Sequence, residues 1–585
     1  MNQKLLLAHL LWTYSAFASS DVISAPTSPT SVPGGAILNQ LNDQNRADLS
    51  GQVLQIPEEV VVFEGLKFVG PNQAIIDAAN AYQQQDIGEK LSISDFITKL
   101  NHWMQTEKHF AITFIRQQDG TYSYLDQVIY EGADISNASG LRDGIADSVI
   151  NYGVNPNQPV DVAQLERNAT IQNELPGVVG QYGMVPGNAN GTTRLRDQVG
   201  NGSRFTGHLG TNNEGMRAVG EIAGTGSLHM NNLLGFSDHF AVNGQASEHA
   251  GYISLSGDVL VHASGTRLSI NGSTYQYGYD VLTDANHGLT SNRSRMTGTS
   301  NAYWSELTQP LLRNSENKIN GILGYAYKTN TANANVNAVT APYIDGLGQQ
   351  QPGGSASQFF QQNDNGIHDV YLELNGTSGT RFGKVAYDFK FTYGEARQHL
   401  GSVYSADQFG ADTYGGSFQK FNLQGQFSSL PISRLWDSSL TAATSMQFSD
   451  RNLVTAEQQY VGGAYQMRAW SPQLIGGAQV LWGELGIEKW LTSSLSIKPF
   501  IEAAGVRTNM TNYAEIINGV SVNSKNGNSN FMADVGLSLS YNPPVSGLTI
   551  TGTVAGKLTA NPSQFGMLVT DDSSVRGWLK AQWFF

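Results

Sequence analysis

The chain has 585 residues, no cysteine, 14% charged residues and a formal net charge of −14. Soluble domains carry about 25% charged residues, so the composition does not fit a cytosolic enzyme. The lack of cysteine excludes disulfide scaffolds, thiol nucleophiles and cysteine-based metal sites. The negative charge argues against nucleic-acid binding, and beyond the N-terminal segment no run reaches the ~18 apolar residues of a membrane-spanning helix. A polar, glycine-rich chain can still cross a bilayer as a closed β-barrel, because only every second residue there must be apolar.

Residues 1–18 predict a secretory signal peptide. Lys4 supplies the positive start, residues 5–14 supply an apolar core, and residues 16–18 (Ala-Phe-Ala) match an A-x-A cleavage site. A lone N-terminal membrane anchor is the alternative, but the segment is short for one. We therefore expect the protein to be exported from the cytoplasm.

Residues 19–54 predict a linker that is rich in proline, serine and threonine. Within it, residues 36–49 lack helix breakers and have a thin apolar stripe, so they predict a helix. Two interpretations remain open for this segment: a disordered spacer, or a polar helix that plugs a wet cavity.

Residues 55–200 have a mixed α/β pattern that occurs twice, in residues 55–126 and 127–200. Each half combines short strands with two helices, which predicts two small tandem α/β modules. We expect helices at residues 73–84, 92–107, 141–152 and 160–173, and strands at residues 60–69, 111–116, 122–130, 127–135, 178–184 and 192–198.

Residues 201–585 lose the helical signal and alternate between apolar and polar residues. The segment Phe531–Tyr541 is an example, because all its odd positions are apolar or aromatic. Counting such segments gives about sixteen strands, an even number as in bacterial outer-membrane barrels. The predicted fold class is an all-β transmembrane barrel of antiparallel strands, preceded by two small α/β domains and an N-terminal helix or linker.

The connections between these strands differ in length in a regular way. We expect long loops after odd-numbered strands, facing outside, at residues 280–291, 330–366, 396–415, 450–473, 507–528 and 559–574. Short turns are expected after even-numbered strands, for example at residues 263–265, 378–380, 491–494 and 542–547. The last strand ends with Trp583 and Phe585 on one face, which is typical of a barrel-assembly signal.

Three segments resemble the two-partner secretion transporters (TpsB type), which are outer-membrane barrels preceded by two polypeptide-transport-associated (POTRA) domains. The second α/β module ends with Pro176-Gly177 and then Pro186-Gly187, similar to the family's run before the barrel. Residues 462–470, from Gly462-Gly463 to Arg468 and Trp470, resemble the family's G-G-x-x-S-V-R-G-Y, and they lie in the sixth outside loop. Phe500-Ile501-Glu502 resembles the F-x-D-x-G of the following strand.

The chain also departs from the family's pattern. Met467 replaces valine, Ala469-Trp470 replaces glycine-tyrosine, Glu502 replaces aspartate and Ala504 replaces the last glycine. These departures indicate a divergent member.

The strand at residues 495–503 places Phe500 and Glu502 on one face and Ile501 on the other. A charge on the lipid face would cost up to about 2–4 kcal/mol, less for glutamate, so Glu502 should point into the lumen. A long loop folded into the lumen could bring Arg468 to it, and such a pair can be bidentate. From the residues alone, two solvated lumen charges without a partner are the favoured interpretation; the resemblance implies the pair.

The resemblance implies a transporter in the outer membrane, with its N-terminal domains in the periplasm. An unfolded secreted exoprotein (adhesin, haemolysin or toxin) would add as a strand to a POTRA sheet edge, thread the lumen and fold outside. The other implied partners are outer-membrane lipids and, during biogenesis, the barrel-assembly machinery. We expect no nucleic acid, cofactor, metal or catalytic site.

Three other functions stay open at this point. An insertase of the same superfamily would usually carry more than two POTRA domains. An outer-membrane hydrolase would need a Ser/His/Asp cluster at the rim, and no nucleophile elbow occurs in the sequence. A passive porin would need no periplasmic modules.

Overall fold

The computed structural model describes residues 60–585, in two compact units formed by residues 60–202 and 203–585. It leaves out residues 71–72, 108–112, 117–119, 126–128, 189–191, 284–288, 315, 341–342, 345–349, 352–353, 399–414, 512–513, 518–519, 524–527, 565–566, 569–570 and 572. The predicted signal peptide, linker and helix at residues 36–49 lie outside the described residues. None of the helices in the described part of the chain is long and apolar enough to span a membrane.

The first α/β module contains two helices and two small sheets. Its elements are β1 (Val60–Val62), β2 (Phe68–Val69), α4 (Gln73–Gln83), β3 (Lys90–Ser92), α5 (Ile93–Thr106), β4 (Thr113–Arg116) and β5 (Tyr122–Leu125). The sheet β2-β5-β4 packs on buried aromatic and aliphatic residues of the helices, and β1 pairs with β3. The single strand predicted at residues 60–69 is therefore wrong: it is two strands in different sheets, separated at Gly65, whose φ of 95° is left-handed.

The second α/β module has one mixed sheet of order β7-β6-β9-β8. Its elements are β6 (Ile129–Asn137), α6 (Asp143–Ile150), β7 (Gln158–Pro159), α7 (Val162–Asn173), β8 (Val178–Pro186) and β9 (Thr192–Asn201). Tyr130, Ile150, Leu165 and Leu195 form its buried core. Strand β8 therefore lies at one edge of the sheet, with β9 as its neighbour.

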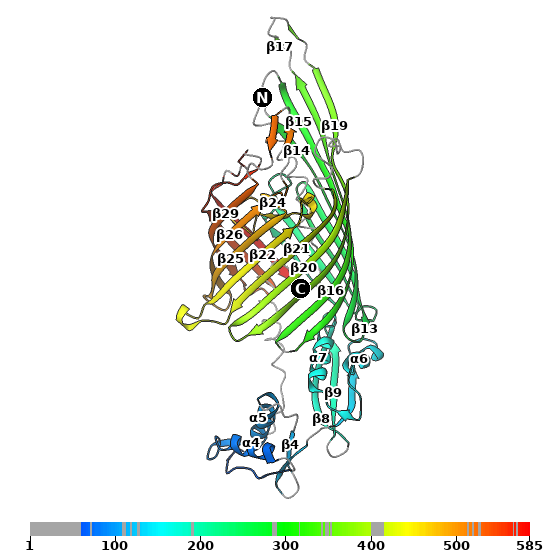
Figure 1. The fold of residues 1–585 in the computed structure, drawn as a ribbon, viewed down its shortest axis with the longest axis vertical. Helices are drawn as coiled ribbons and strands as arrows, with labels where there is room; N and C mark the ends of the chain where they lie inside the picture. Colours follow the sequence, from blue (N-terminus) through cyan, green and yellow to red (C-terminus); the bar gives the residue numbers. More distant parts are fainter. Residues whose placement is uncertain are drawn as a thin grey trace. The chain divides into compact units, whose positions relative to one another are not determined.

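Residues 203–585 form a closed antiparallel barrel of sixteen strands (Figure 1). In order around the ring they are β10 (Phe205–Asn212), β11 (Ala223–Asn231), β12 (His239–Ser247), β13 (Ala250–His262), β14 (Thr266–Thr283), β15 (Leu289–Arg313), β16 (Asn317–Thr340), β19 (Gly354–Thr380), β20 (Gly383–Gln398), β21 (Gly416–Ser429), β22 (Ser439–Ser449), β25 (Gln479–Trp490), β26 (Leu495–Arg507), β29 (Ser529–Tyr541), β30 (Leu548–Lys557) and β33 (Val575–Phe584). The first and last strands pair, with Leu209 opposite Trp583, and this pairing closes the ring. The predicted strand number and fold class are confirmed.

The loop lengths follow the predicted alternation in most of the ring, but the third strand, β12, is joined to β13 by only two residues, so the long loop expected after every odd-numbered strand is wrong there. Short turns follow even-numbered strands, while the connection after the eleventh strand runs over residues 450–478. Two loops are shorter than predicted. The loop expected at residues 280–291 is shortened because β14 extends to Thr283, and the loop expected at residues 330–366 is shortened because β16 extends to Thr340 and β19 begins at Gly354. Figure 1 shows this pair, together with β15, which pairs with β16 along its length, rising beyond the other strands of the ring.

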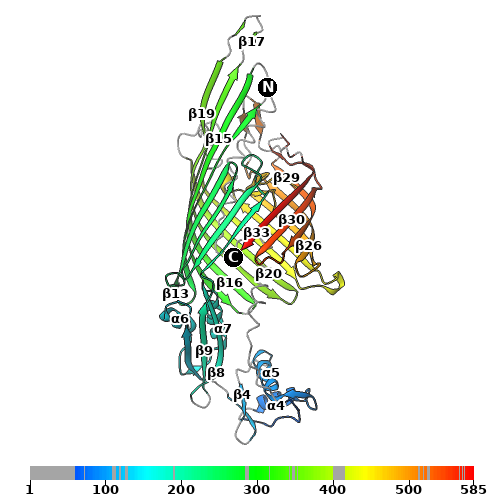
Figure 2. The same cartoon turned by 180° about the vertical axis from the view of Figure 1, so that it is seen from behind.

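The alternation along β26 divides inward from outward side chains as predicted. Ser496, Phe500 and Glu502 are almost fully buried, whereas Ile501 between them is 49% exposed on the outer face. An inward charge in this strand therefore meets protein rather than lipid. Seen from behind, in Figure 2, β33 runs beside β30 on the same wall.

Candidate functional site

The loop between β22 and β25, residues 450–478, enters the barrel and contacts inward-facing side chains. It begins with the short 3-10 helix η3 (Thr455–Glu457), and β23 (Gln459–Val461) then pairs with β24 (Ile475–Gly477) to form a hairpin base. We call residues 450–478 the lumen loop and residues 462–474, beyond this base, its tip.

The tip starts with two glycines that the local geometry requires. Gly462 and Gly463 have φ angles of 111° and 114°, a region that side chains disfavour. A Cβ on Gly462 would lie 2.2 Å from the carbonyl oxygen of Ser471. The predicted Gly-Gly pair thus makes a tight turn that brings the start and the end of the tip together.

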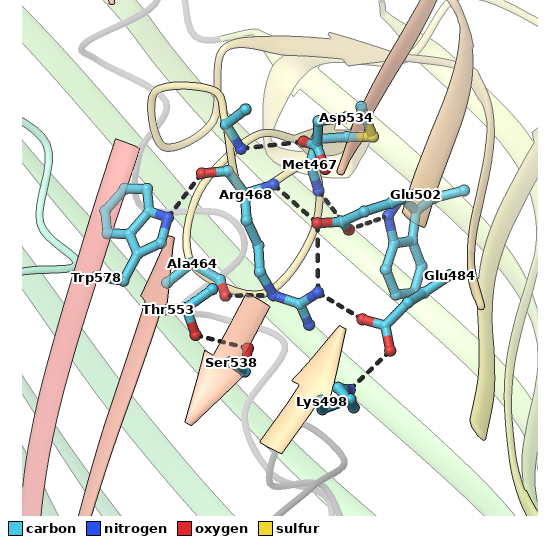
Figure 3. Close-up of polar contacts among 12 residues, drawn as sticks. Ala464, Met467, Arg468, Glu484, Lys498, Glu502, Asp534, Ser538, Thr553 and Trp578 are labelled. Atoms are coloured by element: carbon cyan, nitrogen blue, oxygen red, sulfur yellow. Dashed lines mark hydrogen bonds and ion pairs between the residues drawn. The ribbon is translucent and has the colours of Figure 1, made fainter. Parts of the chain in front are cut away.

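Arg468 in the tip makes polar contacts with two strands of the wall (Figure 3). Its Nη1 lies 2.5 Å from Glu484 Oε2 on β25 and 3.3 Å from Glu502 Oε1 on β26. Its Nε donates to the carbonyl oxygen of Ala464 at 3.1 Å, and the guanidinium lies 4.3 Å from the centre of the Phe500 ring. The expected contact between Arg468 and Glu502 is present, but it is not bidentate, and the shorter ion pair is with Glu484.

Glu502 contacts the backbone of the tip more closely than it contacts the side chain of Arg468. Its carboxylate accepts hydrogen bonds from the backbone N–H groups of Met467 (2.9 Å) and Arg468 (3.0 Å) and from Trp482 Nε1 (2.9 Å). Asp534 on β29 accepts the next one, from Ala469 at 3.0 Å (Figure 3). Three consecutive backbone N–H groups of the tip are therefore bound by two carboxylates of the wall.

Glu484, Glu502 and Asp534 form a row across three neighbouring strands. Glu484 lies opposite Glu502 in the pairing of β25 with β26, and Glu502 lies opposite Asp534 in the pairing of β26 with β29. Lys498 Nζ contacts Glu484 at 2.7 Å and partly offsets the negative charge. Glu484 and Asp534 were not predicted as site residues. Each is an acidic side chain at an inward position of an alternating strand, and this pattern is the signal that could have identified them.

Trp470, the residue that replaces tyrosine in the motif, is fully buried. It shares a buried cluster with Met467, Trp482 and Met532, and Lys557 Nζ lies 4.3 Å from the centre of its ring. This cluster adds apolar packing to the ionic contacts of the tip, so the tip is held by both kinds of interaction.

Two further residues of the C-terminal strand region bind the tip. Asp571 accepts a hydrogen bond from the backbone N–H of Ser471 at 2.9 Å and pairs with Arg576 at 2.7 Å. Trp578 Nε1 donates to the carbonyl oxygen of Arg468 at 2.7 Å (Figure 3). No sequence pattern identified Asp571, because its position depends on how two loops pack.

The other predicted site residues make their contacts within the closing seam of the barrel or within the second α/β module. Phe585 exchanges two backbone hydrogen bonds of 3.0 Å with Gly207 at the closing seam, and Trp583 Nε1 donates to Ser546 O. In the second α/β module, Pro176 and Gly177 lie between α7 and β8, and Pro186 ends β8. The backbone N–H of Gly187 donates to Thr192 O at 2.9 Å, and a Cβ there would clash with Thr192, so the motif shapes the turn into β9.

Comparison with known proteins gives matches by sequence and by structure. Residues 191–341 match the family model "Haemolysin secretion/activation protein ShlB/FhaC/HecB". The heme/hemopexin transporter protein HuxB of Haemophilus influenzae is 22% identical over 263 residues, which are 41% of this chain and 46% of HuxB. The match thus spans about half the length of that relative.

Two solved structures share the fold over nearly their whole length. CdiB from Escherichia coli has a TM-score of 0.59 at 16% identity, covering 94% of this chain and 97% of CdiB. CdiB from Acinetobacter baumannii has a TM-score of 0.58 at 12% identity, covering 97% of this chain and 99% of that protein. Together with the sequence matches, they support a transporter of the two-partner secretion (ShlB/FhaC/HecB) type, and they show its outer-membrane β-barrel fold.

Proposed function

We propose that the protein binds an unfolded secreted partner in the periplasm and passes it through the barrel to the cell surface. The observation that carries this proposal is the lumen loop, held inside the closed barrel by Glu484, Glu502 and Asp534. A barrel whose interior is occupied by its own loop fits a gated path. An open pore, as in a passive porin, does not need such a fixed loop.

The two N-terminal modules support the binding step, and we infer that they are POTRA domains. Strand β8 lies at a sheet edge and exposes Val179, Tyr182 and Met184 to about half their full extent. An extended client chain can add to such an edge through backbone hydrogen bonds, while apolar side chains give it a surface to cover. This mode suits an unfolded chain because it depends little on sequence.

The direction of transport must come from the client itself. The periplasm holds no ATP, so the free energy that the client gains by folding outside is the proposed driving force. The name of HuxB describes a transporter, and the matched family consists of secretion and activation proteins rather than enzymes. These names favour a secreted exoprotein as the client over the substrates of a barrel-folding insertase.

A secretion assay tests the proposal. The full chain is expressed in a bacterial host with a candidate large exoprotein, and the exoprotein is measured in the medium and on the cell surface. We expect secretion that requires the full chain and is lost in Arg468→Ala, while Arg381→Ala, in a short turn away from the lumen loop, secretes normally. An exoprotein that reaches the surface equally well without this chain would contradict the proposal.

A further inference from the structure

A second cluster of charges holds the lumen loop at its base, away from Arg468. Glu457 Oε1 lies 2.7 Å from Lys328 Nζ, and its Oε2 lies 2.6 Å from Lys420 Nζ. Lys328 also pairs with Asp369 Oδ2 at 2.7 Å. We call these four residues the Glu457 latch. Two lysines and two carboxylates make the cluster neutral, and both carboxylates are almost fully buried.

The backbone at Glu457 is bound as well. Gln447 Nε2, on β22, donates to the carbonyl oxygen of Glu457 at 3.1 Å and to that of Gly477 at 3.1 Å. Gln447 therefore joins the two ends of the hairpin base, but Glu457 supplies the loop's side chain to the ionic contact. Glu457 is thus the residue on which the latch depends.

The latch and the tip bind different arcs of the ring. The latch partners come from β16, β19 and β21, whereas the tip partners come from β25, β26, β29 and β33. Six strands separate β16 from β29 around the barrel. The lumen loop is therefore attached to two separate arcs of the wall, and releasing either attachment would free one arc for a passing polypeptide.

The two ties differ in what their opening exposes. Releasing the tip would expose the fully buried side chains of Trp470 and Met467 and leave Glu502 and Asp534 without their backbone donors. Releasing the latch separates charged groups that regain hydration in a wet lumen, which offsets the lost ion pairs. At the latch the loop gives up the Glu457 side chain, two carbonyl contacts and the packing of Leu453, Val454 and Tyr460 on the wall. The tip gives up a larger buried apolar cluster and three backbone N–H contacts with carboxylates. The latch is therefore the tie that opens at the lower cost.

We propose that the Glu457 latch is the releasable side of the gate: when it opens, a path forms along β16, β19 and β21 while the tip stays bound to β25, β26 and β29. Glu457 is a positioning residue in this mechanism, since it holds the loop and does not react with anything. The inference rests on the proposed function in taking the path to be that of an extended polypeptide.

Single-channel conductance of the full chain in planar bilayers tests the latch without any client. Because the chain has no cysteine, the variant Lys420→Cys with Glu457→Cys carries two unique thiols that a short bis-methanethiosulfonate reagent can bridge. We expect frequent large openings before bridging, their loss after bridging and their return on reduction. Large openings that persist in the bridged channel would overturn the proposal.

A second pair of cysteines locks the tip instead. Tyr465 Oη in the tip contacts Glu214 Oε2, in the loop after β10, at 2.6 Å. Bridging Glu214→Cys with Tyr465→Cys should leave the large openings in place, since the tip stays bound when the gate opens. Their loss on bridging would show that the tip is the moving side and would overturn the proposal. The cysteine-free parent, treated with the same reagent, controls for nonspecific effects.

A substitution of the latch carboxylate gives an independent measurement. Glu457→Gln keeps the side-chain size but removes the charge, and we expect the frequency of large openings to rise at least about tenfold. Lys420→Gln should raise it less, because Lys328 still binds Glu457. The matched control is Lys390→Gln, which removes an inward lysine that pairs with Glu373 on the wall. Unchanged opening in both latch variants would overturn the proposal, whatever the secretion assay shows.

Discussion

Glu502 accepts two hydrogen bonds on each carboxylate oxygen, and this geometry makes a substitution by glutamine costly. Oε2 accepts from Met467 N and Trp482 Nε1, and Oε1 accepts from Arg468 N and Nη1. In Glu502→Gln one oxygen becomes an NH₂ group, so two donors lose their acceptor. Hydrogen bonds to a charged group contribute about 1.5–3 kcal/mol each. After partial relaxation we expect the docked loop to lose about 3 kcal/mol, or roughly 100-fold in its docking equilibrium.

Trypsin provides the assay, because Arg468 is itself a cleavage site that docking protects. The peptide bond between Arg468 and Ala469 has its N–H bound to Asp534 and its carbonyl bound to Trp578. Cleavage must therefore proceed through the undocked loop, and its rate reports the undocked population. We expect the fragment starting at Ala469 to appear roughly 100-fold faster in Glu502→Gln than in the parent.

Two variants define how this result is interpreted. Glu502→Asp keeps the carboxylate but shortens it, so its rate should lie between those of the parent and Glu502→Gln. Glu373→Gln, which changes an inward carboxylate that binds Asn375 and Lys390, should cleave like the parent. Equal cleavage rates in the parent and Glu502→Gln would refute the view that Glu502 holds the tip.

The remaining predictions concern other parts of the chain. Arg468→Lys should lose most secretion, like the alanine variant, while the barrel still shows its heat-dependent gel shift. The planar guanidinium of Arg468 contacts Ala464 O and two carboxylates at once, and the compact ammonium of lysine cannot make all three contacts. Deleting Phe585 removes the backbone pair with Gly207 and should reduce the amount of assembled barrel in the membrane, measured by the same gel shift. Burial raises the pKa of Asp197, although Gln172 donates to it at 2.7 Å. The second module should therefore be most stable below the ordinary aspartate pKa and lose stability as the pH rises through the raised value. Hydrogen exchange of β9 amides in the full chain should show this loss, and Asp197→Asn should remove it.

The barrel could be predicted from the sequence because its signal is local. Strict alternation fixes which side chains face inward, so the strand number and the inward position of Glu502 both followed from it. The first module was harder, since Gly65 interrupts an apolar run that otherwise predicts one strand.

The site was only partly predictable, because it depends on register and on loop packing. Arg468 and Glu502 came from a motif resemblance, but the row that includes Glu484 and Asp534 requires the pairing of three strands to be known. Glu457 and Asp571 lie in long loops, and their partners are more than ten residues away or on other strands. No periodic pattern identifies such residues.

The unequal strand lengths have a consequence for whatever leaves the barrel. β16 and β19 have 24 and 27 residues, whereas β10 has 8, and a tilted strand needs only ~9–11 residues to cross the hydrocarbon core. More than half of the length of this pair therefore lies outside the bilayer on the side of the long loops, as a continuously hydrogen-bonded extension of the barrel wall. Under the proposed function, an emerging chain would have a fixed backbone wall on one flank and open water on the other, so its first folded segment would form beside a surface that is already ordered.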